Sequence, residues 1–225
     1  MRLSLPARLG VRTVALAYLA VLVALPVGMV LQRALAPGLA TFWASVTTPA
    51  AIAAFNLTLT LLAIVVPLNV ILGTVTALVL VRGGSFRGKA LLQAFLDLPF
   101  AVSPVVIGVA LIALWGAGGW FGGLADAGVR VIFATPGMAL ATAFVTLPFV
   151  VREVEPVLRE VGDEQEQAAA TLGATGWQTF WRITLPSIRW GLTYGTLLTV
   201  ARGLGEYGAV LLVSSNLPGV SQTLT

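Results

Sequence analysis

Few residues in this sequence can do chemistry. It has no cysteine and no histidine, so it lacks thiolate nucleophiles, imidazole bases and the metal sites that both provide. Charged residues make up only 10% of the chain. These absences predict that the chain is not an enzyme, has no catalytic residues and holds neither a metal ion nor a cofactor. An intramembrane enzyme is the weaker alternative, because Asp97 is the only aspartate within a long apolar stretch.

Two opposite charges lie within an apolar stretch near the end of the sequence. Arg202 and Glu206 are four residues apart, so they can face one another on a helix. Ionisable groups in such a setting are costly and mark either function or pairing. Two interpretations stay open. The charges form a neutralising pair that fixes helix packing, or Arg202 lends positive potential to an anion path while Glu206 controls its availability.

Two further groups of residues invite a chemical interpretation. Asp97 stands just before Pro99, a position that favours a satisfied packing contact over a proton carrier. Gly83, Gly88 and Lys89 open a phosphate-binding motif, Gly-x4-Gly-Lys. Residue 90 is alanine, however, so the hydroxyl that would hold Mg²⁺ is missing. We therefore predict that no nucleotide binds to this chain.

The elements that must position these residues are membrane-spanning helices. The chain is 58% hydrophobic with a mean hydropathy of +0.96, well above the range of soluble domains. In these apolar segments only helices can satisfy the hydrogen bonds of the backbone N–H and C=O groups, because the alternating strands of a membrane barrel are absent from the sequence. The sequence predicts an all-α integral membrane protein with five spans, each long enough for a bilayer core of roughly 30 Å, at 13–32, 52–81, 90–115, 131–151 and 190–213.

The first span has an alternative interpretation, because three arginines precede it and Ala34-Leu35-Ala36 resembles a signal-peptide cleavage site. Basic residues set the orientation of all five spans. Arg33 and Arg130 lie on one side, and ten others lie on the opposite side: Arg2, Arg8, Arg12, Arg82, Arg87, Lys89, Arg152, Arg159, Arg182 and Arg189. This asymmetry predicts a cytoplasmic N-terminus. Basic residues placed this way indicate membrane orientation and no nucleic-acid binding.

The connection at 152–189 is long and should have structure of its own. Acidic residues at 163, 164 and 166 favour a helix start. Gly173 predicts a turn, and Trp177, Phe180 and Trp181 continue at helical spacing until Leu185-Pro186, where we expect the second short helix to end. Periodicity alone leaves open whether this segment lies on the membrane surface or meets a partner.

Spacing in this loop resembles that of the EAA loop in permeases of binding-protein-dependent ABC importers. The motif reads EAA-x3-G-x9-I-x-LP, and the positions that match it here are Gln167, Ala168, Ala169, Gly173, Ile183, Leu185 and Pro186. Gln167 departs from the motif, since glutamate is usual there, although Glu166 directly precedes it. A salt link through that carboxylate is therefore in doubt, whereas the residues that set the shape of the loop are present.

Other segments are similar to the sulfate and molybdate branch of this family. DLPFAVSPVV at 97–106 and ARGLGEYGA at 201–209 carry that similarity. LPFVVRE at 147–153 and LPSIRW at 185–190 most resemble W-type sulfate/thiosulfate permeases. The resemblance implies a type I ABC importer permease fold over residues 1–225, with a cytoplasmic coupling loop at 152–189 and a location in the bacterial inner membrane.

The resemblance also implies partners and a path. A related T-type permease would complete a heterodimer, two copies of an ATP-binding subunit would hydrolyse ATP, and a periplasmic binding protein would deliver sulfate. Ser103, Arg202 and Glu206 fall in the segments that would line the path. Molybdate or tungstate remains an alternative cargo, and transport driven by an ion gradient an alternative mechanism. We also expect a sixth span beyond Thr225, because five spans leave that end outside the cytoplasm.

Overall fold

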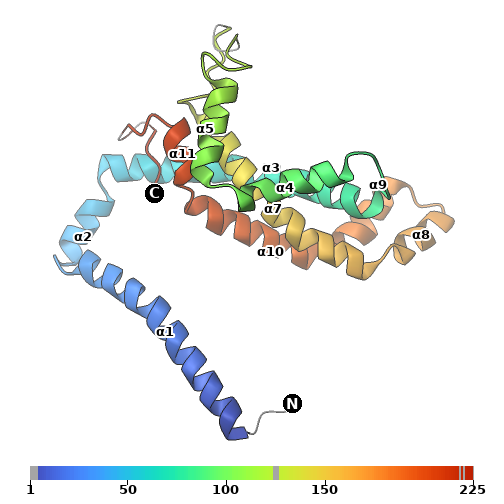
Figure 1. Ribbon diagram of the computed structural model, residues 1–225, viewed down its shortest axis with the longest axis horizontal. Coiled ribbons are helices and arrows are strands. Elements are labelled where there is room, and N and C mark those ends of the chain that lie inside the picture. Colours follow the sequence, from blue (N-terminus) through green and yellow to red (C-terminus); the bar gives the residue numbers. More distant parts are fainter. Residues whose placement is uncertain (1–4, 124–126, 218, 220, 225) are drawn as a thin grey trace. The chain divides into compact units, whose positions relative to one another are not determined.

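The computed structural model describes residues 5–123, 127–217, 219 and 221–224. Within these residues, all the regular secondary structure is helical, as expected for an all-α protein. The chain divides into two units, Met1–Ile52 and Ala53–Thr225. Figure 1 labels the helices.

The first unit contains α1 (Leu5–Leu35) and the short α2 (Leu39–Val46). The turn between them is made by Gly38, whose φ of 97° suits a residue without a Cβ. The predicted first span lies entirely within α1. The side chains from Gly10 to the end of α1 are almost all exposed and mostly apolar, so this helix needs lipid or another protein around it.

The second unit begins within α3 (Pro49–Arg82) and is built around α7 (Thr135–Val161), which has buried residues along its whole length. Its other elements are α4 (Lys89–Ala101), α5 (Pro104–Trp115), α8 (Glu164–Thr171), α9 (Gly176–Thr179), the π-helix η1 (Phe180–Thr184), α10 (Leu185–Leu204) and α11 (Gly208–Val213). One buried apolar cluster joins α7 to α3, α5 and α11. A second joins the other end of α7 to α3, α4 and α10.

Glycines let α10 lie directly on α7. A Cβ at Gly191 would come within 2.6 Å of the Glu153 carbonyl oxygen, and one at Gly195 within 2.8 Å of Val150 Cα. The two helices run side by side in Figure 1. The small residues at these two positions therefore serve helix packing, as small-xxx-small faces do in membranes.

Two predicted spans are not continuous helices. The third is bent by 119° between α4 and α5, because Pro104 forces the residue before it, Ser103, into an extended conformation (φ −60°, ψ 138°). The fifth is interrupted between Leu204 and Gly208. Among the described residues, three helices are long and apolar enough to cross a membrane, and the bent pair would make a fourth. The predicted third and fifth spans are therefore helical but interrupted.

The two interruptions lie next to each other. A Cβ at Gly208, the first residue of α11, would lie 3.2 Å from Pro104 Cβ at the start of α5. Figure 1 shows α11 beside α5. Irregular backbone at membrane depth is tolerated only where protein buries it or where it lines a water-filled cavity, so each interruption shields the other.

The α7–α10 contact predicts the effect of a substitution. Gly195→Leu should push the backbones apart and lower the free energy of unfolding by roughly 1–3 kcal/mol or more, which reduces the amount of chain in the membrane several-fold. Gly28→Leu is the matched control, since a Cβ there meets nothing within 4 Å. Immunoblots of membrane fractions measure both variants. Equal amounts of the two variants would contradict this packing.

Candidate functional site

The connection after α7 folds into a compact pair of helical segments. α7 continues through Arg152 to Val161, and α8 starts at Glu164 with acidic residues in its first turn, as predicted. Gly173 has a φ of 83°. Its N–H donates to the Ala170 carbonyl, and the N–H of Ala174 donates to the Ala169 carbonyl, both at 3.0 Å. This pair of bonds is a Schellman motif, so the predicted glycine turn after α8 is confirmed.

The second helical segment begins with a capping box that sequence inspection missed. The Thr175 hydroxyl accepts from the Gln178 N–H at 3.3 Å, and Gln178 Oε1 accepts from the Thr175 N–H at 2.9 Å. A Thr-x-x-Gln pattern is the signal that could have revealed it. The box fixes where the chain re-enters a helix after the turn at Gly173.

The expected helix end at Leu185-Pro186 is wrong. The Leu185 N–H donates to the Phe180 carbonyl, five residues back, so the chain passes through one π turn and continues into α10. Pro186 has no N–H to give an α-helical bond and would clash with the carbonyl four residues back. The wider π turn relieves both problems. The loop is consequently continuous in helix with the long α10.

The seven motif positions form two groups. Gln167, Ala168 and Gly173 are exposed on and after α8, and Ala169 is half-buried. The other three lie at the junction with α10, where Ile183 and Leu185 are half-buried and Pro186 is exposed. The structure thus places the first group on an open surface and the second at the base of a long helix.

A cluster of aromatic rings stands beside this surface. The ring of Trp177 lies 6.3 Å from that of Phe180 and 5.4 Å from that of Trp181. Trp177 is 70% exposed and Leu172 is 88% exposed. Large apolar side chains left this open favour contact with another protein or with lipid.

The most connected charged group of the loop is Glu166, which sequence reasoning did not place in the site. Glu166 Oε2 lies 2.9 Å from Arg82 Nε, and Glu166 Oε1 accepts from the Thr184 hydroxyl at 2.8 Å. Arg82 stands at the end of α3, where the sequence indicated only a topology determinant. These partners are 84 and 18 residues from Glu166, so no local pattern could have revealed the first contact.

Arg202 and Glu206 face one another, as their spacing suggests. Arg202 Nη1 lies 2.8 Å from Glu206 Oε2, and the Glu206 side chain is fully buried. Glu206 Oε1 also accepts from the Ala209 N–H at 3.0 Å. Glu206 lies in the interruption between α10 and α11. The pair neutralises two charges, and the bond from Ala209 to Glu206 holds the start of α11.

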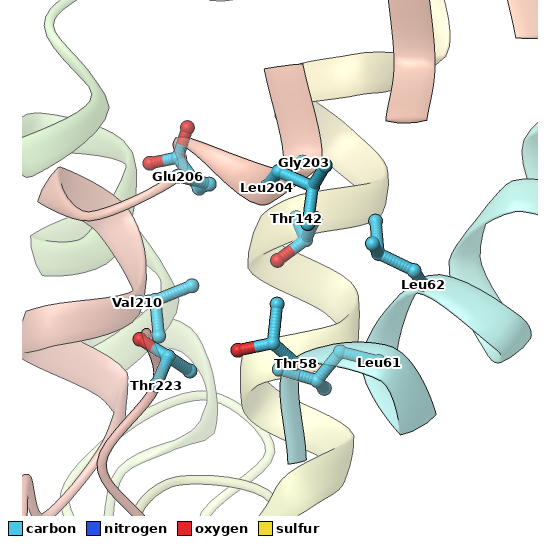
Figure 2. Close-up of a pocket in the computed structure, with 9 residues that line it drawn as sticks. All are labelled: Thr58, Leu61, Leu62, Thr142, Gly203, Leu204, Glu206, Val210 and Thr223. Carbon is cyan, nitrogen blue, oxygen red and sulfur yellow. The ribbon is translucent and has the colours of Figure 1, made fainter. Parts of the chain in front are cut away.

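A small cavity adjoins this pair (Figure 2). Its volume is about 10 Å³, comparable to the space of one water molecule. In Figure 2, Thr142 of α7 lies just below Gly203 and Leu204, and Thr58 of α3 lies beside Leu61. The whole lining is Thr58, Leu61, Leu62, Thr142, Gly203, Leu204, Glu206, Val210 and Thr223. The cavity is too small for an oxyanion.

Three candidates from the sequence remain: Ser103, Asp97 and the Gly-x4-Gly-Lys segment. Ser103 is exposed at the bend between α4 and α5, and its side chain does not cap α5. Asp97 Oδ1 pairs with Arg152 Nη2 at 2.7 Å, which is the polar contact expected of it. Arg82 and Lys89 bound the segment between α3 and α4, so the Gly-x4-Gly-Lys sequence joins two helices and not a strand and a helix.

Residues 69–225 match the family described as "Binding-protein-dependent transport system inner membrane component". The chain is 50% identical to "Sulfate permease 2, chloroplastic" of Chlamydomonas reinhardtii over 213 residues, which is 94% of this chain and 58% of that protein. It therefore spans less than two thirds of that relative.

Two permeases from one cyanobacterium allow a direct comparison. In Synechocystis, the "Sulfate transport system permease protein CysW" is 50% identical over 211 residues, covering 93% of this chain and 76% of the relative. The protein called CysT from the same organism is 40% identical over 206 residues, covering 91% and 72%. The chain is more similar to the W-type protein than to the T-type one.

The buried ion pair predicts the effect of a charge change. Arg202→Gln leaves the Glu206 carboxylate buried without its cation, which costs about 3–5 kcal/mol, so the amount of chain in the membrane should fall sharply. Arg202→Gln combined with Glu206→Gln should recover most of it, because the new amide still accepts from the Ala209 N–H. Membrane levels of both variants measure this. If the variant with Arg202→Gln alone were as abundant as wild type, the pairing role would be contradicted.

Proposed function

The chain belongs to the family of binding-protein-dependent transport system inner membrane components, and we propose that it is a membrane-spanning subunit of an ATP-driven importer for sulfate or thiosulfate. The observation that supports sulfate as the cargo is the 50% identity to the CysW permease of Synechocystis over 93% of this chain. Molybdate or tungstate is the alternative cargo, since these oxyanions differ modestly from sulfate in size.

Partners follow from the same proposal. A T-type permease pairs with this chain in the bacterial inner membrane, two ATP-binding subunits attach on the cytoplasmic side, and a periplasmic sulfate-binding protein delivers the anion. The higher identity to the W-type relative supports a heterodimer over a dimer of identical chains. The exposed apolar side chains of α1 are consistent with a need for lipid or a second permease.

The loop surface is suited to an ATP-binding subunit. Gln167, Ala168 and Gly173 are exposed on or just after α8, and small side chains permit close approach of a partner surface. The Schellman turn and the capping box make the loop rigid, so it transmits a displacement that a flexible loop would absorb. Gln167 supplies an amide where the motif has a carboxylate, and this contact therefore depends on hydrogen bonding and shape, without a salt link.

The anion path is proposed to pass the two helix interruptions. Ser103 lies at one, and Arg202 with Glu206 spans the other. Discontinuous helices in transporters commonly flank the sites where substrates pass, and the Arg202 side chain is 33% exposed in this chain. Its positive charge would then face an anion while Glu206 holds it in place.

The proposal is tested with the complete complex in proteoliposomes. We expect uptake of labelled sulfate to require internal ATP and the binding protein, and to be unaffected when the ion gradients are dissipated. Excess thiosulfate should compete, and molybdate should compete much less. ATP-independent uptake driven by a gradient would refute the coupling, whereas stronger competition by molybdate would refute the cargo.

The path is tested by the double variant Arg202→Gln with Glu206→Gln. Its membrane level should be near that of wild type, since the charges are removed together. Sulfate uptake should nevertheless remain at least about fivefold below wild type, because the cationic group is gone. Normal uptake by this variant would show that the pair serves packing alone.

The loop is tested at Gly173. Gly173→Val forces a β-branched residue to a positive φ, at a strain of about 1–3 kcal/mol, and we expect normal membrane levels, weaker copurification of the ATP-binding subunit and loss of uptake. Gly173→Asn is the control, because asparagine tolerates this φ, and it should retain part of both properties. Full copurification and uptake with valine would favour a membrane-surface role for the loop.

A further inference from the structure

We propose that Glu166 is a positioning residue that ties the coupling loop to α3, α7 and α10, so that a displacement of α8 moves all three helices. This inference rests on the proposed function, since it concerns how the loop transmits movement. It differs from the motif's usual carboxylate position, which is occupied here by Gln167. In this chain, the carboxylate one residue earlier is directed into the protein.

The first connection runs to α3 through a forked ion pair. Arg82 Nε lies 2.9 Å from Glu166 Oε2, and Arg82 Nη2 lies 3.4 Å from Glu166 Oε1. A guanidinium that meets both carboxylate oxygens fixes direction as well as distance. The two side chains are only 23% and 21% exposed, so solvent screens this pair less than an ordinary surface ion pair.

The second connection runs to α7 through the same arginine. Arg82 Nη1 donates to the Leu158 carbonyl at 3.2 Å, and Arg82 Nη2 donates to the Gly162 carbonyl. The last carbonyls of a helix have no partner within it and favour a positive charge nearby. Arg82 therefore holds the end of α7 and the carboxylate of α8 at the same time.

The third connection runs to α10. Thr184 is 5% exposed and stands at the end of the π turn, directly before α10. Its hydroxyl donates to Glu166 Oε1 at 2.8 Å. The π turn that accommodates Pro186 thus also brings this hydroxyl to the carboxylate.

Little else attaches α8 to the rest of the protein. Its described residues include no buried side chain. The other side-chain hydrogen bond from this helix, from the Thr171 hydroxyl to the Ala168 carbonyl, stays within it. Without Glu166, α8 would be held by its chain connections and by its small contact with α9 and η1, and it could then shift without moving α3 or α7.

The test uses the assembled complex with the substitution Glu166→Gln, which keeps the size of the side chain and removes its charge. Glu164→Gln is the matched control, because Glu164 is an exposed acidic residue of the same helix with no ion pair among the described residues. We expect Glu166→Gln to copurify with the ATP-binding subunit and to hydrolyse ATP. Sulfate transported per ATP should fall at least about fivefold, the lower end of typical coupling between sites.

A spin label provides a readout that is independent of cargo. The chain has no cysteine, so Thr171→Cys introduces a single labelling site on α8. Glu166→Gln should increase the mobility of that label, and Glu164→Gln should not. Thr184→Val should act in the same direction, and Thr184→Ser should restore wild-type behaviour, because only the hydroxyl is needed.

The outcomes separate this inference from the proposed function. Absence of ATP-driven uptake in the wild-type complex would refute the function and leave the mobility test intact. Unchanged label mobility together with unchanged transport per ATP in Glu166→Gln would overturn the positioning role. Loss of the ATP-binding subunit from Glu166→Gln would also overturn it, since the carboxylate would then be a contact for that subunit.

Discussion

The contact between Arg82 and Glu166 determines what the loop can transmit. The other ties of α8 to the long helices are its chain connections and one small packing contact, and α8 buries no side chain. The ion pair joins the loop to the ends of α3 and α7, and the Thr184 hydroxyl adds the start of α10. Three long helices and one short helix therefore meet at a single carboxylate. Because the turns at Gly173 and Thr175 are rigid, a displacement of the loop is passed on to these helices.

Close packing of α10 on α7 connects the loop to the middle of the second unit. Because Gly191 and Gly195 let α10 lie directly on α7, a movement at the start of α10 cannot be absorbed by a gap between the two helices. Beyond the far end of α10, α11 begins at Gly208, where a Cβ would lie 3.2 Å from Pro104 Cβ at the start of α5. The loop and the helix interruptions are consequently connected by one close-packed pair of helices, with the Arg202–Glu206 pair at its end.

Sequence patterns predicted the helices and turns that depend on residues close together in the sequence. Apolar runs located the long helices, the acidic residues at 163–166 located the start of α8, and Gly173 marked a turn that has positive φ. The contact of Arg82 with Glu166 could not be predicted, because it joins positions 84 residues apart. The helix end expected at Pro186 failed because a π turn can accommodate a proline that an α-helix cannot. Pro104 was visible in the sequence and accounts for the 119° bend, but its proximity to Gly208 joins positions about a hundred residues apart and could not be predicted.

The central claim is that α8 and the start of α10 move as one body. The most direct test is a distance measurement between spin labels at Gln165→Cys on α8 and Arg189→Cys on α10, in the complete complex with and without ATP. The account predicts that this distance stays the same in both states, while the distance between equivalent labels on this chain and its partner permease changes. A change in the α8–α10 distance upon ATP binding would contradict it.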